Sequence, residues 1–190
     1  MASTGDLSLF KGRLYPNKPP GTVFSALPAY FAIYHIERGL GIDPDDWWPL
    51  TINAYLTTVF SVSLLTALGG VAFYRVSLRL FPLAPRWAHA ASTMTFGLGT
   101  LVLPFATMLF DHDIVAALSL FSFWLLLVVK DSGLTLLRSA VVLLAAGILT
   151  GLTVVMNYSS VISLVLLTLY AAWTARTRSE ERRVGKECRL

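Results

Sequence analysis

The chain has 190 residues, of which 55% are hydrophobic and only 14% are charged, and its mean hydropathy is +0.66. These values exclude an ordinary soluble domain and indicate an integral membrane protein. The net charge of +4 and the pI near 9.4 would also suit a nucleic-acid binder, but the basic residues flank apolar runs and do not line one face, so we expect no nucleic-acid partner.

Residues 1–48 precede the first long apolar run and contain a Lys-Pro-Pro-Gly segment at residues 18–21. The stretch from about 22 to 40 is mostly apolar but ends with Glu37 and Arg38, which predicts an amphipathic helix on the outer membrane surface. Two prolines follow Lys18, so its ammonium group could be held where it meets a phosphate at headgroup level. Simple snorkelling to lipid headgroups is the alternative, and residue type alone favours it.

The apolar runs that follow suit helices crossing a hydrocarbon layer about 30 Å thick. Polar turns at Asp111-His112-Asp113 and at Asn157 divide two runs that are too long for a single crossing. The predicted spans lie at about 49–74, 87–110, 114–129, 139–156 and 160–174. The predicted fold class is all-α: a polytopic transmembrane helix bundle of about five spans over residues 49–175, with one outward-facing interfacial helix.

Lysine and arginine collect in alternate loops, and short cytoplasmic loops retain such residues. The positive loops lie at 75–86 and 130–138, and the tail 176–190 is positive too, so we expect a cytoplasmic C-terminus. Residues 1–48 and the acidic turn 111–113 then face outward.

No apolar segment carries residues 1–48 across the bilayer, so we expect an additional span upstream of Met1 and interpret the chain as a fragment. The tail changes abruptly in composition, and we expect its last dozen residues, Ser179–Leu190, to be foreign to the protein.

The turn Asp111-His112-Asp113 is the strongest cluster of chemically active side chains. Its carboxylates could bind a metal, accept a proton or accept a hydrogen bond from a sugar hydroxyl. A short turn between two spans also needs hydrophilic residues for structural reasons alone, and this alternative is equally good. We interpret Asn157 and Tyr158 in the next outward turn as structural, and the small-residue spacing of Gly147 and Gly151 as helix packing.

The segment Tyr15–Gly21, followed by Ala-Leu-Pro-Ala-Tyr at 26–30, resembles bacterial GT-C glycosyltransferases. These membrane enzymes are related to the dolichyl-phosphate-mannose protein mannosyltransferases and the lipid A aminoarabinose transferases. Weaker similarity extends through Thr107–Ala116 and Gly147–Tyr158, so the likeness covers about residues 8–175.

The resemblance implies a polyprenyl-phosphate-linked sugar donor, an acceptor at the extracytoplasmic face of a bacterial plasma membrane, and inversion at the anomeric carbon. It also implies that Lys18 contacts the lipid phosphate and that Asp111, His112 and Asp113 line the same cavity. The catalytic aspartate of the family's first outward loop has no counterpart here, and Asp6 is a poor substitute, so we expect the catalytic residue upstream. A divalent metal ion stays open as a cofactor.

Two other classes of function fit the composition: a multi-pass transporter or lipid flippase, and a non-catalytic membrane scaffold subunit. The predicted spans carry no Lys, Arg, Asp or Glu in their interiors, whereas a substrate pathway through a membrane usually needs such a residue. This favours an enzyme that works at the outer interface over a transporter.

Overall fold

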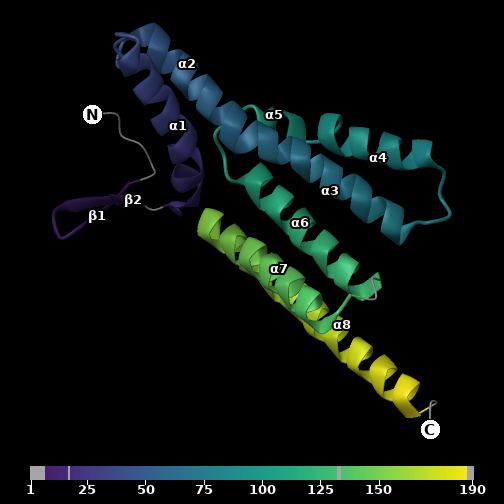
Figure 1. Cartoon of the computed structure of the whole chain (residues 1–190). Helices are drawn as coiled ribbons and strands as arrows, with labels where there is room; N and C mark the ends of the chain where they lie inside the picture. Colours follow the sequence, from purple (N-terminus) through teal and green to yellow (C-terminus); the bar gives the residue numbers. More distant parts are fainter. Residues whose placement is uncertain (1–6, 17, 132–133, 188–190) are drawn as a thin grey trace.

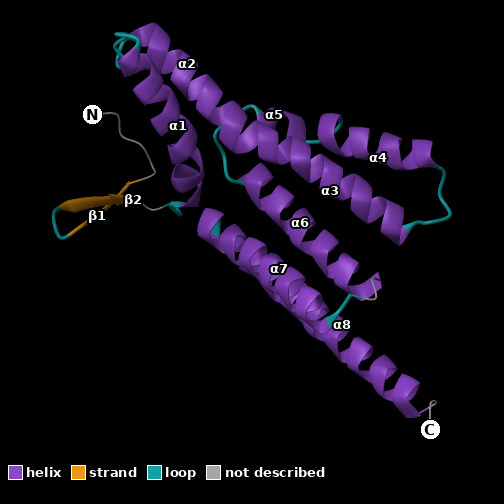
Figure 2. Ribbon diagram, viewed as in Figure 1, coloured by secondary structure: helices purple, strands orange, loops and turns teal. Residues whose placement is uncertain are grey.

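Helices form most of the chain in a computed structural model that describes residues 7–16, 18–131 and 134–187, the last ten of these as backbone only (Figures 1 and 2). The predicted all-α class is confirmed. The elements are β1 (Leu7–Phe10), β2 (Arg13–Pro16), α1 (Gly21–Gly39), α2 (Trp47–Thr58), the π-helix η1 (Val59–Ser63), α3 (Leu64–Leu80), α4 (Arg86–Leu98), α5 (Val102–Ala106), α6 (His112–Asp131), α7 (Leu136–Met156), the 3-10 helix η2 (Tyr158–Ser160) and α8 (Val161–Glu187).

The two strands form a small antiparallel hairpin that sequence analysis did not foresee. Its tip is the pair Lys11-Gly12, and both residues have positive φ, 49° and 75°. Two such residues in a row make the tight turn that suits the twist of paired strands. The hairpin side chains are exposed.

Four helical stretches are long and apolar enough to cross a membrane, within the part of the chain that the structure describes. They are Trp47–Leu80, His112–Asp131, Leu136–Met156 and Tyr158–Thr177. The first is 34 residues long and continuous through η1. At 1.5 Å per residue it is about 51 Å long, well beyond the roughly 30 Å of a hydrocarbon core.

The segment 87–110, predicted as a single span, is divided into α4 and α5, and neither helix is long enough to cross a membrane. The helix α4 ends where the Gly99 N–H bonds to the Thr95 carbonyl. The segment nevertheless runs back along α3: Phe73 stacks on Phe96 with ring centroids 4.6 Å apart, and Ser63 Oγ donates to the Ala106 carbonyl at 2.6 Å. A crossing at this segment stays a prediction.

The loops lie at two ends of the bundle, as the predicted alternation of spans requires. At one end Arg79 pairs with Asp131 at 3.0 Å, and Lys130 Nζ lies 5.2 Å from the centroid of the Trp173 ring. At the other end Asn157 donates a hydrogen bond to Asp111. The positive loops and the acidic turn are therefore separated by the length of α6.

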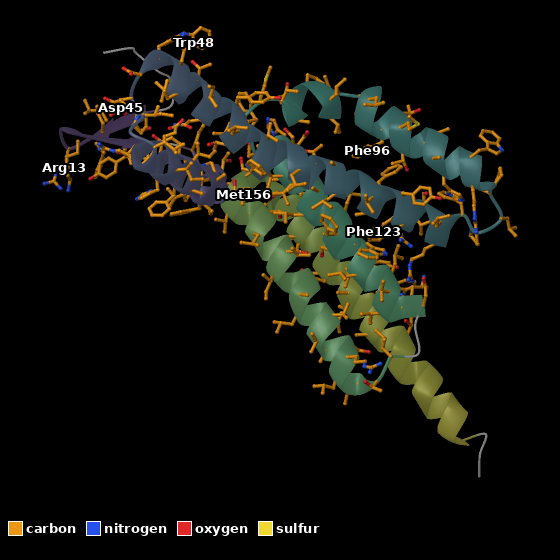
Figure 3. All side chains as sticks on the ribbon, turned by 45° about the horizontal axis from the view of Figure 1, so that its top comes forward. Arg13, Asp45, Trp48, Phe96, Phe123 and Met156 are labelled. Atoms are coloured by element: carbon orange, nitrogen blue, oxygen red, sulfur yellow. The ribbon has the colours of Figure 1, made fainter. Side chains whose placement is uncertain are left out.

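The predicted helix at 22–40 forms as α1, but it packs antiparallel along α2 as one arm of a helical hairpin (Figure 1). A buried hydrogen bond of 2.7 Å from Asn53 Nδ2 to Glu37 Oε2 joins the two arms. Side chains such as Phe24 and Phe31 remain exposed. Asp45 and Trp48 mark the connection at the far end of the hairpin (Figure 3). The location of α1 on the membrane surface stays a prediction.

Small and hydroxylated residues mediate the closest helix contacts in the bundle. A Cβ at Gly69 of α3 would lie 2.9 Å from the Ala117 Cβ of α6. By contrast, a Cβ at Gly147 or Gly151 would meet nothing within 4 Å, so the predicted packing role of these two glycines is wrong. Instead α7 approaches α6 around Thr150.

A buried hydroxyl network joins α6 and α7. Ser122 Oγ lies 2.6 Å from Thr150 Oγ1 and 3.0 Å from the Ala146 carbonyl. Interhelical hydrogen bonds in membrane proteins average about 0.6 kcal/mol. We therefore expect Ser122→Ala to lower the free energy of unfolding by about 0.6 kcal/mol. Denaturant titration in mixed micelles measures this loss, and Ser92→Ala, at an exposed position, is the control. A loss above about 2 kcal/mol would contradict the expected effect.

Candidate functional site

A pocket of about 520 Å³ lies where α1 begins, α6 begins and α7 ends, at the end of the bundle that carries the acidic turn. Met156 marks the pocket end of α7 (Figure 3). The pocket is lined by Lys18, Pro19, Thr22, Val23, Leu109, Phe110, Asp111, His112, Met156, Asn157, Tyr158 and Ser159. Three separate segments of the chain, within 18–23, 109–112 and 156–159, therefore build one site, and it contains three of the four residues that the sequence singled out.

Gly21 explains how Lys18 reaches this pocket. A Cβ at Gly21 would lie 2.5 Å from the Val155 carbonyl oxygen and 2.7 Å from Met156 Cα. Real side chains do not tolerate such distances to backbone atoms, so only glycine lets the first turn of α1 rest on the end of α7. The Lys-Pro-Pro-Gly segment thus joins a cation to a fixed helix start.

The start of α1 adds positive potential to that of Lys18. Its N-cap is Pro20, no side chain caps it, and its first turn contains no acidic residue. The unpaired N–H groups and the macrodipole of a helix start both favour an anion. Together with the Lys18 ammonium group, they make this wall of the pocket suited to a phosphate.

Asp111 and Asn157 form a polar part of the pocket lining. Asn157 Nδ2 donates to Asp111 Oδ2, and Asn157 Oδ1 accepts from the Ser159 N–H at 2.9 Å. The Asp111 side chain is 18% exposed, so it is largely shielded but still in contact with the pocket. This tie connects the loop before α6 with the turn after α7.

His112 lies at the pocket mouth with 55% of its side chain exposed. Its ring packs edge-on against Phe105 at 5.1 Å and lies parallel to Phe110 at 6.3 Å. Its Nδ1 is 3.8 Å from Asp111 Oδ1, which is too long for a hydrogen bond. The two aromatic rings hold the imidazole while an edge stays open to a ligand.

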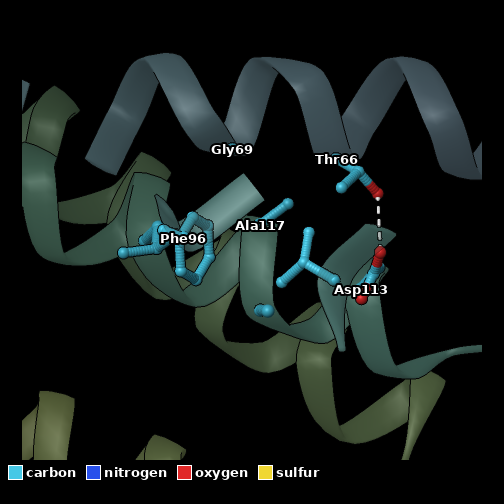
Figure 4. A pocket seen from close by; sticks show the side chains of 8 residues that line it. Thr66, Gly69, Phe96, Asp113 and Ala117 are labelled. Carbon is cyan, nitrogen blue, oxygen red and sulfur yellow. Dashed lines mark hydrogen bonds between the residues drawn. The ribbon is translucent and has the colours of Figure 1, made fainter. Parts of the chain in front are cut away.

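Asp113, which sequence analysis places in the same cavity as Lys18, lines a separate space of only about 10 Å³ between α3 and α6 (Figure 4). It is 5% exposed and accepts a hydrogen bond of 3.3 Å from Thr66 Oγ1. Successive residues on a helix point about 100° apart, so His112 and Asp113 in the first turn of α6 cannot face one cavity. Asp113 therefore ties α6 to α3.

An apolar groove of about 340 Å³ adjoins the pocket and shares Val23 and Leu109 with it. It runs between α1 and α2 and includes Leu27, Tyr30 and Ala54. Thr57 also lines the groove, and its hydroxyl is buried without a hydrogen-bond partner among the described residues. The combined site has one charged end and one apolar end, which suits an amphiphilic ligand.

Asp111 and His112 offer two ligands to a metal ion. Among the residues that the structure describes, no group of three His, Cys, Asp or Glu side chains converges anywhere. Any metal held in this pocket would need further ligands from substrate or water.

Sequence reasoning missed two residues of the site. Gly21 was noted only as part of a motif, although a glycine directly after two prolines at a helix start was a signal for close backbone approach. Asn157 was interpreted as structural, and nothing in the sequence pairs it with Asp111, which lies 46 residues away.

Comparisons of this chain with protein-family models, with curated proteins and with solved structures found no match. The functional argument therefore comes from the fold, the pocket and the sequence motifs.

Proposed function

We propose that the pocket binds the phosphate of a polyprenyl-phosphate-linked sugar and that the protein is a GT-C-like membrane glycosyltransferase. It would transfer the sugar to an acceptor at the extracytoplasmic face of a bacterial plasma membrane. The observation that supports this best is that Lys18 and His112 share one pocket, with an apolar groove beside it. A phosphate bound to a hydrocarbon chain matches both features.

The chemistry of such a transfer needs a cation at this position. The acceptor oxygen attacks the anomeric carbon, the bond from that carbon to the phosphate oxygen breaks, and the departing prenyl phosphate gains negative charge. A fixed ammonium group beside that phosphate stabilises the developing charge. The acceptor proton passes to a base, which in the GT-C enzymes that the sequence resembles is an aspartate.

Binding of farnesyl phosphate, a short prenyl phosphate, tests the proposal. Lys18→Ala should weaken binding by about tenfold or more, because a hydrogen bond between charged groups contributes about 1.5–3 kcal/mol. Isothermal titration of the purified protein in detergent measures the affinity, and inorganic phosphate as competitor separates phosphate recognition from chain recognition. The exposed hairpin variant Lys11→Ala is the matched control. Equal affinities in wild type and Lys18→Ala would refute the assignment.

The proposal also places the pocket outside the cell and the Arg79 end inside. Single cysteines at Tyr158, beside the pocket, and at Leu83, which is 99% exposed beyond α3, report on the two sides once Cys188 is replaced by serine. A membrane-impermeant maleimide on intact bacteria should label Tyr158→Cys and leave Leu83→Cys unlabelled until the membrane is permeabilised. Labelling of both positions at equal rates would contradict the topology.

A further inference from the structure

The orientation of the Asn157 amide follows from its two partners. The backbone N–H of Ser159 can only donate, so the side-chain atom 2.9 Å from it must be the oxygen of Asn157. The amide nitrogen then faces Asp111 and donates to Oδ2. The Asn157 side chain is held at both ends and can align the Asp111 carboxylate without a competing arrangement.

Asn157 bonds to Oδ2 and Asp111 lines the pocket, so the second carboxylate oxygen, Oδ1, remains for a ligand. His112 Nδ1 lies 3.8 Å from Oδ1, too far away for a hydrogen bond. A carboxylate oxygen in a largely shielded position accepts strong hydrogen bonds but repels another anion. A phosphate therefore belongs beside Lys18 and the start of α1, whereas a neutral hydroxyl group suits Asp111.

We infer that Asp111, positioned by Asn157, accepts a hydrogen bond from a sugar hydroxyl of the ligand, so that the pocket selects a glycosyl phosphate over a phosphate ester without a sugar. Lys18 binds the phosphate and Asp111 binds the sugar. Asn157 is a positioning residue, since it acts through Asp111. This inference rests on the proposed function, because it takes the ligand to be a prenyl-phosphate sugar.

The inference is tested by the ratio of two affinities: that for a glycosyl farnesyl phosphate and that for farnesyl phosphate without a sugar. The probes are farnesyl phosphate and the mannosyl, glucosyl and galactosyl farnesyl phosphates, titrated into the full chain in detergent. The wild type should bind at least one glycosylated probe more tightly than farnesyl phosphate. Asp111→Asn and Asn157→Ala should each reduce this preference about tenfold, because a charged, oriented acceptor is lost. Thr107→Ala, exposed and outside the pocket, should keep the wild-type ratio.

A merely structural Asn157 would change stability but leave the ratio of affinities unchanged, which would overturn the inference. So would a wild type that binds all four probes equally. Asp111→Asn is nearly isosteric and decides the question even if Asn157→Ala does not fold. If the wild type binds none of the probes, the proposed function fails and the inference fails with it, whereas retained farnesyl phosphate binding without any sugar preference rejects the inference alone.

Discussion

In Gly21→Ala, farnesyl phosphate should bind at least about tenfold more weakly than in the wild type, and the protein should lose about 1–3 kcal/mol of unfolding free energy. The added methyl group would lie 2.5 Å from the Val155 carbonyl oxygen, and this atom belongs to the backbone at the end of α7. It cannot move aside as a flexible side chain could. The start of α1 must therefore lift off α7, and Lys18 moves away from the pocket that it lines together with Asp111.

The matched control lies in the same helix. A Cβ at Gly39 meets nothing within 4 Å, so Gly39→Ala adds only the helix propensity of alanine, which favours folding by up to about 1 kcal/mol. The two substitutions are chemically identical and should change stability in opposite directions. Denaturant titration gives the stabilities, and isothermal titration gives the affinities. Wild-type affinity in Gly21→Ala would mean that α1 does not depend on this contact.

Gly69→Leu should destabilise the bundle by about 3 kcal/mol, because α3 and α6 meet at this residue. Even a Cβ here would lie 2.9 Å from Ala117 Cβ and 3.1 Å from Ala117 Cα. A leucine would force the two helices apart and open the space beside Asp113 and Thr66. Close approach at small residues is a common basis of helix association in membranes.

The neighbouring residue supplies the control for this substitution. A Cβ at Gly70 meets nothing within 4 Å, so Gly70→Leu should change the free energy of unfolding by less than about 1 kcal/mol. Both variants add the same side chain to the same helix. Unfolding in mixed micelles, followed by tryptophan fluorescence, gives the comparison. Similar losses in the two variants would show that the α3–α6 contact is not the cause.

Polar interruptions in apolar runs are the reason that the pocket could be anticipated. Lys18, Asp111 and Asn157 each interrupt or precede an apolar run, and the alternation of helix directions brings all three to one end. The positions of polar turns follow from hydropathy alone. The direction of each side chain does not follow from hydropathy, because it depends on the phase of the helix. Asp113 therefore lies outside the pocket, while its neighbour His112 lines it.

Packing contacts were harder to predict than helix positions. Gly147 and Gly151 have the spacing of a close helix contact, yet Gly21 and Gly69 are glycines that contact a neighbouring helix. Such spacing makes close approach possible on one face but does not say which face meets a partner. The same limit applies to α1: its apolar composition predicted a helix, whereas its pairing with α2 depends on Glu37 and Asn53, sixteen residues apart.

The division of 87–110 had a visible but ambiguous cause. Gly97, Gly99 and Pro104 fall within a run whose hydropathy suits a single span. Glycine and proline are tolerated in membrane helices, so their presence alone did not argue for a break. The decisive contacts are non-local, such as the bond from Ser63 to the Ala106 carbonyl.

The continuous helix from Trp47 to Leu80 is so long that a small tilt would move its end by several ångströms. A tilt would pivot on the tight contact of Gly69 with Ala117. The helical arm from Gly69 to Trp47 is about 33 Å long at 1.5 Å per residue. A tilt of about 5° around this contact would displace the Trp47 end by roughly 3 Å. Since α1 is hydrogen-bonded to this arm through Glu37, such a tilt would reach the Glu37 end of α1, whereas the start of α1 is held against α7 at Gly21.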